Sequence, residues 1–535
     1  MSNIMRISGM ATGMDTESMI KQLMDAEKIR LNKYNQQKQI KKWTQEAYNN
    51  INKDIANFIL DTKKELGVGF GGSISSASWM KKATSSDTNV FDATATSSAV
   101  SGTHSIEVRQ IASNVNKASL SEIDDPNVDL SGKVVKFKTS SGTEITIDGF
   151  SNINELVNKI NEHSDELKIK ASYDSNFKRF FLSTTEGGEE NIIQISEDNG
   201  NIFTGASSIL KTDLTLNEQY KGTNGEVVFD GAVITTTKNQ FTINGINIDL
   251  KSADAGTVHT IKVDTDVDGV YDKIKGFIDK YNELIDKLNK KISEKRYRDY
   301  QPLTDEQKKA MDEDTVKLWE EKAKSGLLRN DEHITRILSN TRSGLYEPVY
   351  SDYDAGDSGK LSGFSFLTEI GITTGTYQEK GKLKIDETKL KDAIREDVDG
   401  VINLLFNTSD VTESEAKSDP DKAKERRAET GLINRLYDDL ISGMKSIIDK
   451  SGTGDNASLY RQVKSTILID FVTKSGSISL LDKDVINIEK QISRENDRLN
   501  RVENRYWRQF TALEKAMSKM NSQSSWLMSQ MGMGM

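Results

Sequence analysis

Apolar side chains recur every three or four residues over a long stretch near the start of the chain, as on one face of an α-helix. The pattern consists of Ile20, Leu23, Met24, Leu31, Tyr34, Ile40, Trp43, Ala47, Ile51, Ile55 and Phe58. Asp15 stands where a helix N-cap belongs, and Glu17 follows in the first turn, where an acidic group suits the helix dipole. The stretch predicts one long amphipathic helix, or two in series, ending before the glycine-rich GVGFGG at 67–72.

The far end of the chain has a sharper periodicity. Six side chains are spaced by seven residues: Val485, Ile492, Leu499, Tyr506, Leu513 and Met520. The companion positions hold Leu481, Ile488 and Val502, whereas Phe510 and Met517 fit after a shift of one residue. This spacing predicts a coiled-coil seam with a stutter, and Glu495 at a companion position predicts imperfect packing there. Because a one-striped helix must bury its stripe, we expect the two terminal helices to pair antiparallel, with the middle inserted between them.

Between these helices the periodicity changes to the alternation that is typical of β-strands. KVVKFKTSSGTEITID alternates around a Ser-Gly turn, and FTINGINIDL places Asn244 and Gly245 between two alternating runs, which predicts a hairpin. Residues 76–265 are therefore predicted to be mostly β, with one short helix at 152–162. Helical spacing returns over 274–292, 386–406 and 431–450.

These elements predict an α+β multidomain protein. Its long terminal helices would form an antiparallel coiled-coil leg, followed by a helical domain and two nested β-rich head domains. The expected limits are 1–40 with 495–535 for the leg, 41–75 with 268–494 for the helical domain, 76–119 with 226–267 for the first β domain, and 120–225 for the second.

Charge is unevenly distributed along the chain. The 535 residues carry a formal net charge of −10, but residues 1–64 and 478–535 are +4 and +2, so the middle carries −16. An acidic middle argues against nucleic-acid binding, which needs a basic face. The absence of cysteine excludes disulfides, thiolate zinc sites and cysteine nucleophiles. We expect neither a secretory signal nor membrane insertion, so export would need a dedicated machine.

Methionine is concentrated at both ends of the chain. Twelve of the fifteen methionines lie within the first 24 or the last 19 residues. Methionine is unbranched and polarisable, and it suits apolar surfaces that must fit more than one partner geometry. A core position is the simpler interpretation for any single methionine, but the segregation as a whole predicts an adaptable contact surface.

Residues that could carry catalysis or bind metal form no convincing site. The four histidines are far apart and lack metal-ligand spacing. DTDVDG places Asp264, Asp266 and Asp268 at the first, third and fifth positions of a calcium loop, but Lys275 occupies the twelfth, where a bidentate glutamate belongs. A solvated turn between a strand and a helix is the favoured interpretation. We expect no cofactor, no metal and no enzymatic activity.

Several sequence blocks, in order along nearly the whole chain, resemble one known family. They are SGMATGMDTESMIKQLMDAE, ATSSDTNVFDATATSSAVSGTHSIEV, KIKGFIDKYNEL with KSGLLRND, and YWRQFTALEKAMSKMNSQSSWLMSQM. Together they are similar to the flagellar cap proteins, also called hook-associated protein 2. The resemblance implies a non-enzymatic, extracellular homo-oligomer, with a pentamer among the possible numbers, at the distal tip of the bacterial flagellum. There it would promote insertion and polymerisation of exported flagellin.

The resemblance also implies partners and binding residues. The partners are other copies of the chain, flagellin at the filament tip, and a cytoplasmic flagellar export chaperone, with export through the flagellar type III apparatus. The residues implied at the coiled-coil or filament interface are Ile20, Leu23, Met24, Leu31, Tyr34, Val485, Ile492, Leu499, Val502, Tyr506, Phe510, Leu513, Met517 and Met520. The same stripe is needed merely to hold the two helices together, so the sequence does not separate the two roles.

Two other functions stay open at this level. An adhesin would bind host glycans through exposed, aromatic-lined pockets in its β head, although Trp79 is the only tryptophan near that head. A filament or junction subunit would also pair its terminal helices around a β middle. The insert from Tyr297 to Leu328 departs from many members of the family, and the sequence does not indicate its role.

Overall fold

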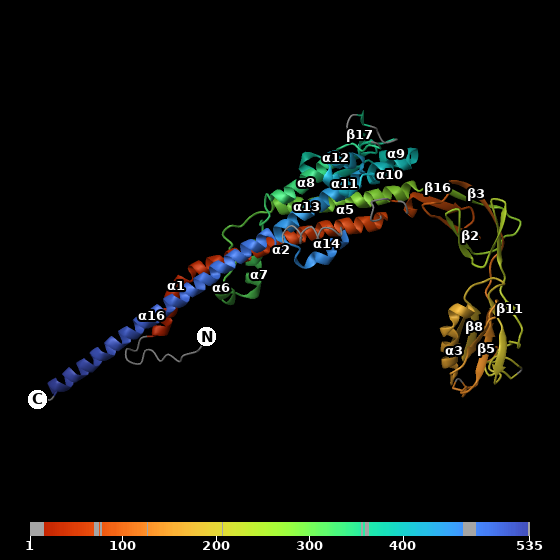
Figure 1. Cartoon of the computed structure of the whole chain (residues 1–535), viewed down its shortest axis with the longest axis horizontal. Helices are drawn as coiled ribbons and strands as arrows, with labels where there is room; N and C mark the ends of the chain where they lie inside the picture. The colour runs from red at the N-terminus through yellow and green to blue at the C-terminus, as the bar shows by residue number, and fades with distance from the viewer. Residues whose placement is uncertain are drawn as a thin grey trace. The chain divides into compact units, whose positions relative to one another are not determined.

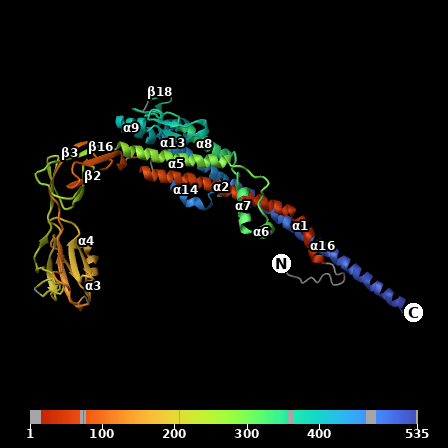
Figure 2. The ribbon, with the colours of Figure 1, turned by 180° about the vertical axis from the view of Figure 1, so that it is seen from behind.

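The structure is a computed structural model, and it describes residues 15–68, 74, 77–125, 127–205, 207–351, 353–354, 357–358, 363–463 and 478–532. The chain divides into two compact units, one formed by residues 1–73 with 271–535 and the other by residues 74–270. The first unit is mainly helical and the second mainly β, so the predicted α+β class is confirmed. Figures 1 and 2 show the elements of each unit from opposite sides.

Three long helices bring both ends of the described chain together in the helical unit. They are α1 (Thr16–Glu27), α2 (Ile29–Leu66) and α16 (Leu480–Gly532). Asp15 caps α1 as predicted, because its carboxylate accepts a hydrogen bond from the backbone N–H of Ser18 at 3.0 Å. α1 and α2 are two helices in series, and α16 packs along both (Figure 1). α2 ends at Gly67, whose φ of 70° is left-handed; residues 69–72 of the glycine-rich segment lie outside the described residues.

The second half of α2 is buried in the body of the helical unit. It packs with α13 (Leu432–Ser451) and α5 (Val267–Ser293), and the rings of Phe58, Phe277 and Tyr437 lie 5.7 to 6.4 Å apart. The helices predicted over 386–406 and 431–450 are confirmed as α9 with α10 and as α13. The other elements are α6 (Asp305–Lys309), α7 (Glu313–Lys324), α8 (Glu332–Gly344), α9 (Glu387–Glu396), α10 (Val398–Phe406), α11 (Glu413–Ser418), α12 (Pro420–Glu429), α14 (Ala457–Val463), and the strand pairs β17 (Tyr353–Asp354) with β18 (Asp357–Ser358) and β19 (Ile372–Thr374) with β20 (Leu383–Ile385).

A buried arginine ties the loops of this body together. Arg435 of α13 is 1% exposed. Its guanidinium donates hydrogen bonds to the backbone carbonyls of Gly344, Glu347, Pro348, Ala428 and Thr430. Burial lowers the pKa of Arg435 to about 10, so the group stays charged near neutral pH and keeps all its donors.

The β unit contains two hydrophobic cores, and the first lies between two antiparallel sheets. Their strand orders are β1-β16-β3-β12-β13 and β14-β15-β2. The strands are β1 (Lys81–Ser85), β2 (Phe91–Ala95), β3 (Gly102–Gln110), β12 (Gly225–Phe229), β13 (Ala232–Thr236), β14 (Gln240–Ile243), β15 (Ile246–Leu250) and β16 (His259–Thr265). The predicted hairpin is confirmed, since β14 and β15 pair across Asn244 and Gly245, whose φ angles are 49° and 77°.

The second core of the β unit is covered by a short helix, α3 (Ile153–Glu162), which packs against β7. Asn152 caps α3 through a hydrogen bond from the N–H of Glu155, so the helix predicted at 152–162 is confirmed. The sheets are β4-β8-β7, β10-β5-β6 and β11-β9. Their strands are β4 (Asn116–Ala118), β5 (Val134–Lys138), β6 (Glu144–Ile147), β7 (Ile169–Asp174), β8 (Arg179–Thr184), β9 (Ile192–Ile193), β10 (Ile195–Asn199) and β11 (Tyr220–Lys221). The domain limits predicted from the sequence remain a proposal.

Candidate partner-binding site on the terminal helices

The predicted apolar stripes of the terminal helices meet in one cluster. Ile20 and Met24 of α1 are buried against Leu499 and Val502 of α16. Half-buried side chains complete the cluster: Leu31, Tyr506, Trp507 and Phe510. Leu23 was predicted to join them but is 40% exposed. Trp507 was not predicted, because it lies one residue after Tyr506 and so falls outside the seven-residue spacing. The shift by one residue at Phe510 and Met517 was the signal in the sequence that could have identified it.

A group of charged side chains continues the seam where an interruption was expected. Glu495 is 5% exposed, and Arg498 Nε donates to its Oε1 at 2.8 Å. Arg498 Nη1 donates to Glu27 Oε2 at 2.7 Å, and Nη2 donates to the backbone carbonyl of Glu27 at 3.2 Å. That carbonyl belongs to the last residue of α1, where helix carbonyls lack intrahelical donors. Glu495 interrupts the apolar seam, and paired charges fill the position; whether the packing there is imperfect stays a prediction.

We call Glu27, Glu495 and Arg498 the polar cluster. Arg498, by its hydrogen bond to the ionised carboxylate, lowers the pKa of Glu27. A polar group at a coiled-coil core position costs stability but fixes the register of the two helices. We therefore expect the cluster to favour the register in which Glu27 faces Arg498.

Ion pairs extend the contact between α2 and α16. Lys38 Nζ lies 2.6 Å from Glu489 Oε1, and Lys41 Nζ lies 2.7 Å from Asp484 Oδ2. Residue numbers rise on α2 as they fall on α16, so the helices run antiparallel, as predicted. The other predicted residues of this part, Tyr34, Val485 and Ile492, are half-buried.

Beyond Phe510 the seam of α16 is open to solvent. The seam residues there are Leu513, Met517, Met520 and Leu527, the last of which was not among the predicted interface residues. Leu513, Met520 and Leu527 are 45%, 66% and 54% exposed, whereas Met517 is half-buried. Every residue from 521 to 530 is exposed, and Figure 1 shows this end of α16 extending past α1. We call residues 513–527 the open end of α16.

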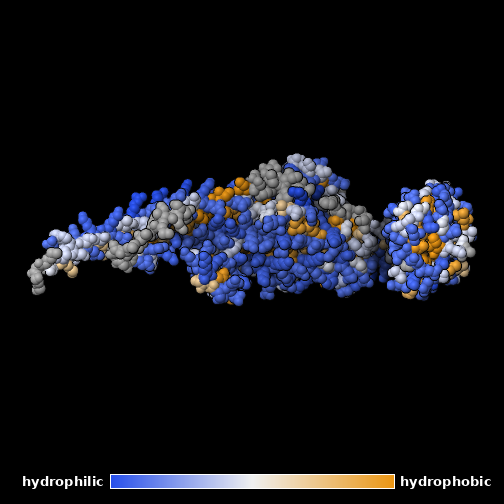
Figure 3. Space-filling view, turned by 90° about the horizontal axis from the view of Figure 1, so that it is seen from below, coloured by the Kyte–Doolittle hydropathy of each residue, from blue (hydrophilic) through white to orange (hydrophobic). Residues whose placement is uncertain are grey.

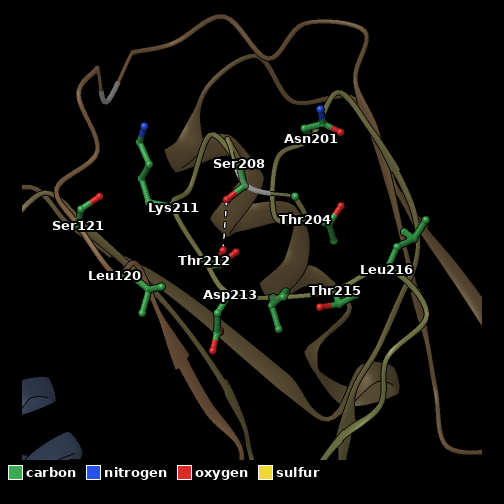
Figure 4. Close-up of a pocket in the computed structure, with 12 residues that line it drawn as sticks. Leu120, Ser121, Asn201, Thr204, Ser208, Lys211, Thr212, Asp213, Thr215 and Leu216 are labelled. Carbon is green, nitrogen blue, oxygen red and sulfur yellow. Dashed lines mark hydrogen bonds between the residues drawn. The ribbon is translucent and has the colours of Figure 1, made fainter.

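Elsewhere, the surface has fewer features that could bind a partner. The face shown in Figure 3 is mostly hydrophilic, with small apolar patches. A hollow of about 710 Å³ in the β unit is lined by polar, charged and aliphatic side chains such as Thr204, Ser208, Lys211 and Leu216 (Figure 4). Ser208 Oγ donates to the carbonyl of Thr212 at 3.4 Å, so part of this lining is engaged internally. The described residues that line this hollow include no aromatic side chain.

The DTDVDG segment is a strand-to-helix turn. β16 ends at Thr265 and α5 begins at Val267, so the second half of any calcium loop is helical. Asp266 Oδ1 accepts a hydrogen bond from the N–H of Gly269 at 2.9 Å, and the carboxylate of Asp264 pairs with Lys262. Within the described part of the chain, no group of three or more His, Asp or Glu side chains could hold a metal ion. The described helices also include none long and apolar enough to cross a membrane.

Fold and site together define a class of protein in which a helix near the start of the chain pairs with one near its end, and a β unit is inserted between them in the sequence. Three family models match the sequence: the flagellar hook-associated protein 2 N-terminus over residues 12–115, its C-terminus over 222–522, and the flagellin hook IN motif over 129–186. The flagellar hook-associated protein 2 of Halalkalibacterium halodurans is 32% identical, over 97% of this chain and 98% of that protein. The chain belongs to the flagellar hook-associated protein 2 family, the flagellar cap proteins.

More distant relatives carry the same name. The flagellar hook-associated protein 2 of Thermotoga maritima is 28% identical, over 74% of this chain and 54% of that protein. The B-type protein of Pseudomonas aeruginosa is 27% identical, over 66% of this chain and 71% of its own. The crystal structure of the flagellar cap protein domains D1-D2-D3 from Escherichia coli aligns at 18% identity with a TM-score of 0.46, covering 76% of this chain and 96% of that one.

Proposed function

We propose that this chain caps the distal end of the flagellar filament as a homo-oligomer and promotes insertion of exported flagellin. The observation that carries the proposal is the open end of α16, where the apolar seam continues past the N-terminal end of α1. A helix with one apolar stripe gains its stability by covering that stripe with another element. For a flagellar cap, the end of the filament would be the surface that covers this stripe.

The side chains of the open end suit a variable partner. A cap with few subunits on a filament end with a different number of protofilaments places each copy in different surroundings. Met517 and Met520, with Met528 beyond them, adapt to such differences better than branched side chains would. The methionines from Met1 to Met14 lie outside the described residues, so this argument rests on the C-terminal group.

The same proposal makes the protein non-enzymatic and exported. Capping requires shape and apolar contact, and it needs no reactive group. Before assembly, the open end of α16 would be the segment that a cytoplasmic flagellar export chaperone covers, since exposed apolar helices aggregate when left free. Export would then follow the flagellar type III route to the extracellular filament tip.

The test is to delete the gene and restore it as one of three forms: the natural sequence, the triple variant L513S/M520S/L527S, or the control K515S/K519S on the other side of the same helix. Flagellin is then quantified in the medium and in filaments. Deletion should abolish filaments while soluble flagellin accumulates, and only the triple variant should fail to restore them. Filaments of normal length after deletion would overturn the capping proposal in favour of an adhesin or a filament subunit.

A further inference from the structure

The insert, residues 297–328, folds as a small helical piece with its own packing. The ring of Trp319 on α7 lies 4.6 Å from that of Tyr300, and its Nε1 donates to the carbonyl of Gln301 at 2.8 Å. Lys308 on α6 pairs with Glu320 on α7 at 2.6 Å. Thr304 and Asp312 cap the two helices. The insert therefore has a defined shape to present to its surroundings.

The two ends of the insert are fastened to each other. Arg296 Nη1 donates to the carbonyl of Ser325 at 3.0 Å, and Ser325 Oγ donates to the carbonyl of Lys295 at 2.7 Å. Gly326 has a φ of 66°, and a Cβ there would lie 2.7 Å from the backbone N of Arg296. The chain thus leaves the helical unit and returns to it at one point.

The insert contacts α2 on the side that faces away from α16. Gln36 Nε2 donates to the carbonyl of Pro302 at 2.9 Å, and Lys324 Nζ lies 5.2 Å from the ring centre of Trp43. Lys38, which pairs with Glu489 of α16, comes two residues after Gln36. Two residues correspond to about 200° around an α-helix, so the two contacts lie on opposite sides of α2. Both views show α7 beside this part of α2 (Figures 1 and 2).

Contact with α16 leaves this part of α2 only partly buried. All residues from 29 to 42 are described, and none of them is buried; Trp43 is the first buried residue of α2. Its polar contacts with α16 include the half-exposed pairs of Lys38 and Lys41, and Leu31 reaches the apolar cluster as a half-buried side chain. Ion pairs as exposed as these contribute little to stability in proteins generally. A helix without buried apolar contacts opens readily.

We infer that the insert is a brace, which clamps residues 29–43 of α2 against α16 and keeps this stretch helical and aligned with the body. Trp43 marks the boundary between the part of α2 that the insert supports and the part that is buried in the helical unit. Lys324 of the insert lies over its ring. The inference is a property of the isolated chain and does not depend on the capping proposal.

The experiment measures amide hydrogen exchange in the full chain after excision of residues 298–324, with two glycines joining Tyr297 to Ser325. The proximity of Arg296 and Gly326 allows so short a junction. Exchange within residues 29–43 should become about tenfold faster or more, while residues 44–66 of α2 keep their protection, because only the local opening is affected.

A second variant keeps the insert and removes its contacts: Gln36→Ala with Lys324→Ala. It should accelerate exchange in residues 29–43 in the same direction. The matched control is Asp314→Ala with Lys317→Ala, a solvent-exposed pair on α7. The brace is refuted if residues 29–43 keep their protection in both variants. It is equally refuted if residues 44–66 lose protection together with them, because the insert would then be part of the core.

Discussion

Among single residues, His104 of β3 contacts a turn and a loop of the β unit through both of its ring nitrogens. Nδ1 lies 2.7 Å from Asp230 Oδ2, in the turn between β12 and β13, and Nε2 lies 3.1 Å from the carbonyl of Val100. The ring is 8% exposed and stacks on Phe229 at 5.4 Å. Both partners are acceptors, and a neutral imidazole has a single N–H, so only the protonated ring satisfies both.

The charge on His104 predicts a pH dependence of the first β core. The hydrogen bond with Asp230 raises the pKa of His104 in the folded chain, against the opposing effect of burial. A raised pKa means that the stabilisation is complete below the unfolded value, near 6.5, and is lost as the pH rises through the folded value. The full chain is unfolded in urea, and amide hydrogen exchange in peptides from β3 reports the unfolding of this strand. The stability of β3 should fall as the pH rises from 5.5 to 8.5.

His104→Gln isolates this contribution. The difference in unfolding midpoint between the natural chain and the variant should be largest at pH 5.5 and should shrink towards pH 8.5. His163→Gln, at a half-exposed helix end, serves as the control. A difference that is independent of pH would show that the ring acts through packing on Phe229 alone.

The pairing of the terminal helices is an element-scale property, and the polar cluster sets its register. A slip of α1 by seven residues along α16 would keep apolar side chains in contact, because the seam repeats with that period. It would also move Glu27 about 10 Å from Arg498, at 1.5 Å per residue, and leave Glu495 with fewer partners. The cluster therefore disfavours neighbouring registers that the apolar residues alone would tolerate.

Arg498→Ala should loosen α1. The change removes a donor to Glu495 and to both the carboxylate and the carbonyl of Glu27, and it leaves the buried Glu495 with the longer, 3.9 Å pair to Arg30. Amide exchange in residues 16–27 should quicken severalfold, with the body unaffected. Arg501→Ala, at an exposed position one turn along, is the control. Unchanged exchange in α1 would mean that the apolar cluster holds the helix without these charges.

The elements that were predicted correctly carry local signals. Asn244 and Gly245 specify their turn by backbone preference, and Asp15 specifies the start of α1 by its side-chain cap. What the sequence left undetermined depends on residues far apart in it. In the sequence, Glu495 only interrupts an apolar pattern, and the fold brings it together with Arg498 and Glu27. The contact of the insert with α2 joins segments more than 260 positions apart. Periodicity identifies an apolar face but does not say which part of it stays uncovered, as at the open end of α16.

On the scale of the whole molecule, the chain passes between its two units only near residues 73 and 270. The strands next to these crossings are neighbours, since β1 pairs with β16 and Lys81 faces Thr265. The β unit is therefore a continuous segment whose ends meet, whereas the helical unit is assembled from two segments far apart in the sequence. Continuous segments with their own core tend to fold independently.

Residues 77–266, expressed alone, should therefore fold. Both hydrophobic cores of the β unit lie within this segment, and all its sheets are complete there. We expect a monomer with a cooperative thermal transition and a β-type circular dichroism spectrum. The matched deletion variant replaces residues 78–268 of the full chain by a short glycine linker and should keep the helical unit folded, with exchange protection in the second half of α2. An unfolded or aggregated fragment would show that the β unit needs the helical unit to fold, and the two could then not be assigned separate roles.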